Sequence, residues 1–227
     1  MKSATRFCQL ALVTSLSFGA VFSAMNAQAS DNKGMYAVTV TNLTRGETFT
    51  PIMVASHKKG THVLTLGEPA SNELTAIAEG GDFGPLSTLL TNSGVAYDIA
   101  TNGGLLAPGA STTIMVNMAD DFDYVTVTSM MIPTNDGFIA VNGVKGPDNK
   151  HGAKVVLSPA YDAGSEMNDE DCMHIPGPVC HGAGPSPESD GEGYVHIHAG
   201  IHGIGDLMSA DYDWRNPTAK IVIKRMK

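Results

Sequence analysis

Two acidic turns carry side chains that could bind a cation. Asp136 lies in the turn at residues 129–138, and Asp162 and Glu166 lie in the turn at residues 161–166. Ca²⁺ takes six to eight oxygen ligands at about 2.3–2.6 Å, which carboxylates and carbonyls from two converging loops can supply. The pattern predicts a metal-stabilised loop end. The alternative is turn capping, because Asp beside Gly is common in turns that bind no metal.

A second group of candidate ligands is the histidine cluster His196, His198 and His202. Alternate residues of a strand share a face, so His196 and His198 are expected side by side. Imidazole clusters suit Zn²⁺ or Cu²⁺. This spacing also occurs on ordinary polar strand faces, so a structural role is the alternative.

Export is predicted from residues 1–29, which read as a signal peptide. Lys2 and Arg6 give a positive start, an apolar run follows, and residues 27–29 (Ala-Gln-Ala) match a signal-peptidase site. The apolar run is shorter than the roughly 20 residues that a membrane span needs. We therefore expect no membrane span and a mature domain of residues 30–227, either periplasmic or extracellular.

Removal of that segment takes Cys8 with it and leaves Cys172 and Cys180. Two cysteines in an oxidising compartment predict a disulfide. Their spacing is too wide for a C-x-x-C motif, and a metal or redox pair is the alternative. The bridge would staple a long irregular loop, residues 162–193, that is rich in Gly, Pro, Ser and acids.

Charge and motifs exclude several function classes. The formal net charge is −9, and it becomes −11 without the two basic residues Lys2 and Arg6. An acidic chain of this kind argues against binding to nucleic acid or to an anionic membrane surface. The sequence has no G-x-S-x-G, H-E-x-x-H or phosphate-loop motif, and we expect no enzyme.

Short runs of β-branched residues must position these side chains. With turn signals between them, they predict an all-β fold: a two-sheet antiparallel β-sandwich with one or two short helices. Pro51 indicates an edge or an irregular start in its strand. The helices are expected at residues 70–81 and 84–91, plugging one end of the sandwich. Strands are expected at residues 36–43, 48–56, 111–118, 124–131, 138–141, 154–157, 194–199 and 219–225.

Several segments, taken in order, resemble the spondin N-terminal (F-spondin) domain family in a bacterial exported form. They are Tyr36 to Thr44, Ala78-Glu79-Gly80-Gly81, Ser129 to Asp136, Asp162-Ala163-Gly164 and Asp213 to Ile221. The resemblance spans nearly the whole mature chain and implies a C2-like β-sandwich with a Ca²⁺ site in loops at one end. It implies Asp136, Asp162 and Glu166 as the calcium ligands. Animal members are extracellular and associated with matrix adhesion and integrin contact.

Two positions depart from the family pattern. Gly137 stands where animal members often carry Trp, and Glu166 replaces Asp. The sequence thus predicts an exported, non-enzymatic recognition or adhesion module in which Ca²⁺ fixes loop geometry. Its partner would be an extracellular protein or surface ligand. The alternative is a periplasmic Zn²⁺- or Cu²⁺-binding protein that uses the histidine cluster.

Overall fold

A computed structural model describes residues 34–185 and 190–226. The chain divides into two units, residues 1–30 and 31–227, and the description concerns the second unit only. The predicted signal peptide, residues 1–29, lies outside the described residues.

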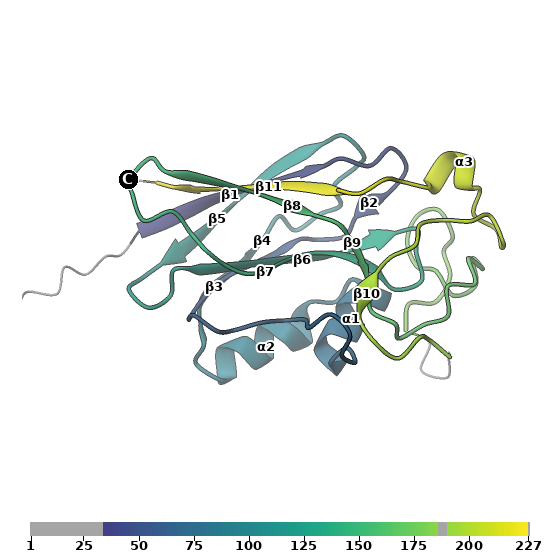
Figure 1. Cartoon of the computed structure of the whole chain (residues 1–227), viewed down its shortest axis with the longest axis horizontal. Coiled ribbons are helices and arrows are strands. Elements are labelled where there is room, and N and C mark those ends of the chain that lie inside the picture. The colour runs from purple at the N-terminus through teal and green to yellow at the C-terminus, as the bar shows by residue number, and fades with distance from the viewer. Residues whose placement is uncertain (1–33, 186–189, 227) are drawn as a thin grey trace, which may run out of the picture. The chain divides into compact units, whose positions relative to one another are not determined.

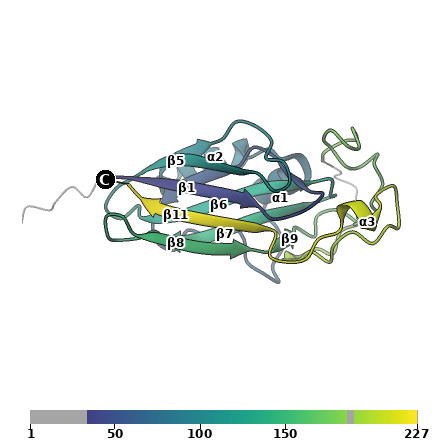
Figure 2. The same cartoon turned by 90° about the horizontal axis from the view of Figure 1, so that it is seen from above.

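Two antiparallel sheets form a β-sandwich (Figure 1). The smaller sheet has the strand order β5-β1-β11-β8, and Figure 2 shows β1 and β11 in its middle. Its strands are β1 (Gly34–Asn42), β5 (Ser111–Met118), β8 (Ala153–Ser158) and β11 (Ala219–Arg225).

The larger sheet has the order β10-β9-β7-β6-β3-β4, and β2 also pairs with β6. Its strands are β2 (Thr48–Phe49), β3 (Met53–His57), β4 (Ala96–Thr101), β6 (Tyr124–Ile132), β7 (Gly137–Lys145), β9 (Ala160–Asp162) and β10 (His196–Ile197). The predicted two-sheet antiparallel sandwich is confirmed.

The main core lies between the two sheets. Val38 and Val40 of β1 lie opposite Ile223 and Ile221 of β11, and all four side chains are buried. Val127 of β6 belongs to the same core. Burying one such aliphatic side chain stabilises the fold by about 1.5–3 kcal/mol. The apolar residues that alternate in the sequence are therefore the ones that face the core.

Two helices, α1 (Asn72–Gly80) and α2 (Gly84–Asn92), pack on the outer face of the larger sheet (Figure 1). Met53 and Ala55 of β3 contact this layer, while Val54 points into the main core. The expectation that the helices plug one end of the sandwich is therefore wrong. They cover a sheet face, which explains why every residue of β3 is buried.

Both helices begin and end close to the predicted residues. The Ser71 side chain accepts a hydrogen bond from the Leu74 amide, and Gly81 ends α1 with φ 66°. A left-handed residue at this position favours glycine. A third, short helix, α3 (Ser209–Tyr212), was not predicted.

The strands differ from the predictions in several places, and the strand predicted at residues 138–141 extends to form β7. Residues 48–56 form β2 and β3 rather than one strand, because the chain breaks around Pro51. Residues 194–199 shorten to β10, and β4 and β9 were not predicted. β4 carries no clean apolar alternation, and most of its residues are only half-buried.

Irregular chain between β9 and β11 gathers at one end of the sandwich (Figure 1). The predicted disulfide staples it, with a distance of 2.02 Å between the sulfurs of Cys172 and Cys180. Among the described residues, none of the helices has the length and apolarity needed to cross a bilayer.

Candidate metal site

Asp136 lies in the turn between β6 and β7. The turn is closed by Thr134, whose hydroxyl donates to the Met131 carbonyl and accepts the Gly137 amide at 3.0 Å. The Asp136 side chain is buried. The local hydrogen bonds of the turn therefore fix a carboxylate inside the protein rather than in solvent.

The Asp136 carboxylate joins the first acidic turn to the second. Its Oδ2 accepts the backbone amides of Ser165 at 2.8 Å and Glu166 at 3.1 Å. Its Oδ1 is buried and has no hydrogen-bond partner in the described part of the chain. A buried charged oxygen without a partner is costly, so this atom is suited to binding a cation or a proton.

Asp162 ends β9 and is also buried. In the sheet it lies opposite Gly137 on one side and His196 on the other. Its Oδ1 accepts the Gly164 amide at 2.8 Å, and its Oδ2 accepts the Asn168 side-chain amide at 2.8 Å. The pairing of β9 with two neighbours thus places Asp162 between the acidic turn and the histidines.

Negative charge accumulates around Asp136. Burial, followed by the charges of Asp162 and Glu166, raises the pKa of Asp136 to about 8, against the lowering effect of the two amide hydrogen bonds. Glu166 is itself buried. Carboxyl groups held close together in a buried site cannot all be ionised without a counter-charge.

His196 reaches the same site from β10. Its Nε2 lies 3.4 Å from Asp162 Oδ1 and 3.6 Å from Glu192 Oε2. Burial lowers its pKa, but the hydrogen bond with the Ile197 carbonyl and the charges of Asp162 and Glu192 outweigh burial, and the net shift is upward. The His196 ring thus lies between the carboxylates of Asp162 and Glu192.

His198 approaches the other oxygen of Asp162. Its Nε2 lies 3.8 Å from Asp162 Oδ2, and Trp214 packs edge-on against the ring with centroids 4.9 Å apart. Burial lowers the pKa of His198. His198 is therefore a neutral, packed side chain.

His202 does not join the other two histidines at Asp162. Its side chain is 59% exposed, and its Nδ1 lies 3.9 Å from Glu170 Oε1. The carboxylate of Glu170 accepts the amides of Gly203 at 2.7 Å and Ile204 at 2.9 Å, and so holds this loop. The structure brings His196 and His198 to Asp162, whereas the carboxylate next to His202 is Glu170.

The second acidic turn and two of the three histidines, His196 and His198, thus meet at Asp162. Sequence reasoning missed Asn168 and Glu192, which complete this site. The Asn168 side-chain amide donates to Asp162 Oδ2 and, at 3.3 Å, to Glu192 Oε1. No motif marks either residue, since both lie in the irregular loop that only the fold brings to β9.

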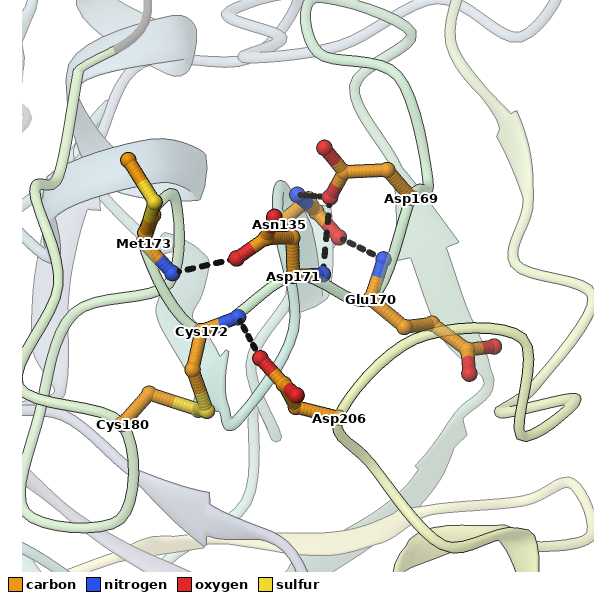
Figure 3. The surroundings of a disulfide bond; sticks show 8 residues. All are labelled: Asn135, Asp169, Glu170, Asp171, Cys172, Met173, Cys180 and Asp206. Atoms are coloured by element: carbon orange, nitrogen blue, oxygen red, sulfur yellow. Dashed lines mark hydrogen bonds between the residues drawn. A yellow bond between two sulfur atoms is a disulfide. The ribbon is translucent and has the colours of Figure 1, made fainter.

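Hydrogen bonds around the disulfide tie that loop to the first acidic turn (Figure 3). The Asn135 side-chain amide donates to Asp169 Oδ1 at 2.9 Å, and Asn135 Oδ1 accepts the Glu170 amide at 3.3 Å. The Cys172 amide donates to Asp206 at 3.1 Å. Asn135, the residue next to Asp136, therefore connects the β6–β7 turn to the loop that the disulfide closes.

Comparison with known proteins identifies the family. The profile of the Spondin_N family matches residues 36–167, which is more than half of the chain. The chain belongs to the Spondin_N family. The comparison with curated proteins returned no match.

Membership of the Spondin_N family and the β-sandwich support a role in recognition or adhesion. The Spondin_N domain is an extracellular, non-catalytic type of module, and the disulfide indicates an oxidising compartment. The matched segment contains Asp136, Asp162 and Glu166. It ends before Asn168, Glu192 and His196.

Proposed function

We propose that this Spondin_N domain is an exported, non-enzymatic recognition or adhesion module whose loops are held by one structural Ca²⁺. The observation that carries the proposal is the Asp136 carboxylate: it is buried beside two further acids, and its Oδ1 has no hydrogen-bond partner in the described structure. Oxygen donors of this kind suit a hard cation.

Asp136, Asp162 and Glu166 would hold the ion. Asn168 offers a fourth oxygen, because its Oδ1 is also buried and has no hydrogen-bond partner among the described residues. These ligands come from the β6–β7 turn, the end of β9 and the loop that follows. When bound, the cation supplies positive charge that offsets the repulsion among the acids and joins the three segments.

Rigid loops at one end of a sandwich are suited to binding a partner, because less conformational freedom is lost on association. We propose an extracellular protein or a surface ligand as that partner. Export to the periplasm or beyond agrees with the disulfide and with the signal peptide predicted at residues 1–29.

Thermal unfolding of the chain with Ca²⁺ or with EDTA tests the calcium site. Millimolar Ca²⁺ should raise the Tm of the wild-type protein; at 100 times Kd a ligand adds about 2.7 kcal/mol of stability. Asp136→Asn should abolish the response. In EDTA at a pH above about 8, this variant should be at least as stable as the wild type, because it removes a buried carboxylate charge.

The control is Asp121→Asn, which removes one exposed acid in the turn before β6. It changes the net charge equally and should keep the full calcium response. A wild-type protein that Ca²⁺ does not stabilise and EDTA does not destabilise would contradict the proposal. Equal responses of the two variants would contradict the assignment of Asp136.

A further inference from the structure

A compact group of ligand atoms that does not include Asp136 meets at Asp162. Among the described residues, Asp162, Glu192 and His196 offer ligand atoms that all lie within 4.8 Å of one another. Asp162 is buried, His196 is half-buried and Glu192 is exposed. The group therefore has a fixed inner end and an outer end open to solvent.

The hydrogen bonds of His196 define which ring nitrogen is free. Its Nδ1 lies 3.0 Å from the Ile197 carbonyl, which can only accept, so Nδ1 carries the proton. In the neutral ring Nε2 then presents a lone pair to Asp162 Oδ1 and Glu192 Oε2. Three lone-pair atoms that face one another are stabilised by a positive charge between them, which a proton or a metal ion can supply.

The spacing of these atoms fits a transition metal. Ligands bonded tetrahedrally to one Zn²⁺ at about 2.0–2.2 Å lie about 3.3–3.6 Å from one another. The distances from His196 Nε2 to the two carboxylate oxygens are 3.4 and 3.6 Å. They are longer than charge-assisted N–H···O bonds, which measure about 2.7–2.9 Å.

His198 has the opposite tautomer and a different role. The Gly200 amide donates to its Nδ1 at 3.0 Å, so the neutral ring carries its proton on Nε2. That Nε2 is buried, has no hydrogen-bond partner in the described residues and lies 3.8 Å from Asp162 Oδ2. An N–H group beside the carboxylate of a ligand can orient a metal-binding side chain.

We propose that Asp162, Glu192 and His196 form a Zn²⁺ site with an open fourth position on the solvent side. His198 and Asn168 are positioning residues: both lie at Asp162 Oδ2, and Asn168 also bonds Glu192. The open position would take water or a side chain of a partner. The zinc site does not rest on calcium, since Asp162 is the only ligand that the two sites share, and Asn168 would use its Oδ1 for calcium and its amide nitrogen for the zinc ligands.

Isothermal titration of the full chain, purified without a histidine tag, tests this proposal. ZnCl₂ is added in buffer that contains millimolar CaCl₂, so that any calcium site is filled. We expect one Zn²⁺ per chain. His196→Ala and Glu192→Gln should each abolish this binding, and Co²⁺ should give the visible absorption of a four-coordinate ion only in the wild type and in the control.

The matched control is His202→Ala, which removes a more exposed histidine of the same segment and should leave zinc binding intact. His198→Gln should weaken it by about 10–100-fold while the stoichiometry stays at one, as expected for a positioning residue. Thermal unfolding in EDTA checks that each variant is folded. Glu192→Gln alters an exposed side chain and should not disturb folding. It therefore tests the zinc site even if His196→Ala does not fold.

The zinc proposal is overturned if the wild type binds no Zn²⁺, or if His202→Ala lowers binding as much as His196→Ala. Asp136→Asn separates the two metal proposals. It should lose the calcium response and keep zinc binding. Zinc binding without any calcium response in the wild type would leave the zinc site standing and contradict the calcium site alone.

Discussion

Glu47 is a buried carboxyl group outside the metal site. Both of its side-chain oxygens are buried without a hydrogen-bond partner in the described residues. Burial, and then the charge of Asp213, raise the pKa of Glu47 well above its ordinary value. A group of this kind makes stability depend on pH.

Glu47→Gln should make the fold less sensitive to rising pH. The folded-state pKa is raised, so the wild-type protein loses stability as pH increases from the unfolded-state pKa towards the folded-state pKa. A neutral amide of similar shape removes that loss. The advantage of the variant should therefore grow from pH 4.5 to pH 8 in urea unfolding at saturating Ca²⁺.

The exposed Glu68 provides the control for that series. Glu68→Gln should follow the wild-type pH dependence. A constant difference between Glu47→Gln and the wild type at all pH values would show that packing, and not ionisation, separates them.

At the residue scale, the sequence marks the three acids and the histidines as candidate ligands, but it does not show which of them come together around Asp162. Asp136, Asp162 and Glu166 stand out because each lies in a Gly- or Pro-containing turn. Glu192 does not stand out, because its place beside His196 depends on the pairing of β10 with β9. The tautomers follow from backbone contacts that no motif encodes.

At the scale of elements, the β6–β7 turn explains the departure at Gly137. A Cβ there would lie 2.6 Å from the Thr134 hydroxyl and 3.1 Å from the His198 ring. The space beside this glycine is filled by the residue that closes the turn and by a histidine of the site. A large side chain does not fit.

Gly137→Ala should therefore cost stability and calcium affinity together. Overpacking of a close-packed site costs about 1–3 kcal/mol, and here the displaced residue is Thr134, which fixes the turn of Asp136. Thermal unfolding with and without Ca²⁺ measures both effects. Gly104→Ala is the control, because a Cβ at Gly104 meets nothing within 4 Å. If Gly137→Ala changed neither the stability nor the calcium affinity, the turn would have to relax without cost, and the prediction would be wrong.

Elements with a clean period could be predicted and irregular ones could not. β5 and β11 begin and end at the predicted residues. β9 has only three residues, too few for a period to be visible. The helices were recognised from cap and spacing, but their place on a sheet face depends on apolar residues of β3 that point away from the main core.

For the whole molecule, the family match and the fold have different extents. The match ends at Met167, but β11 lies further along the chain and pairs with both β1 and β8. Without β11 the smaller sheet loses a central strand, and the apolar faces of β1 and β8 lose their neighbour. The matched segment is therefore not a complete folding unit.

A chain of residues 31–167 should fail to fold, whereas residues 31–227 should give cooperative unfolding. Circular dichroism and thermal melting compare the two directly. If the short chain melts cooperatively, adding a peptide of residues 219–225 in excess tells whether β11 contributes to it. A short chain as stable as the long one would contradict the central role of β11.

The position of β11 has a consequence for biosynthesis. A strand near one end of the described domain lies beside a strand near the other, so the smaller sheet cannot close before Arg225 has left the ribosome. Until then, β1 presents an unpaired edge that can associate with other chains. The smaller sheet can therefore be completed only after nearly all of the described domain has been translated.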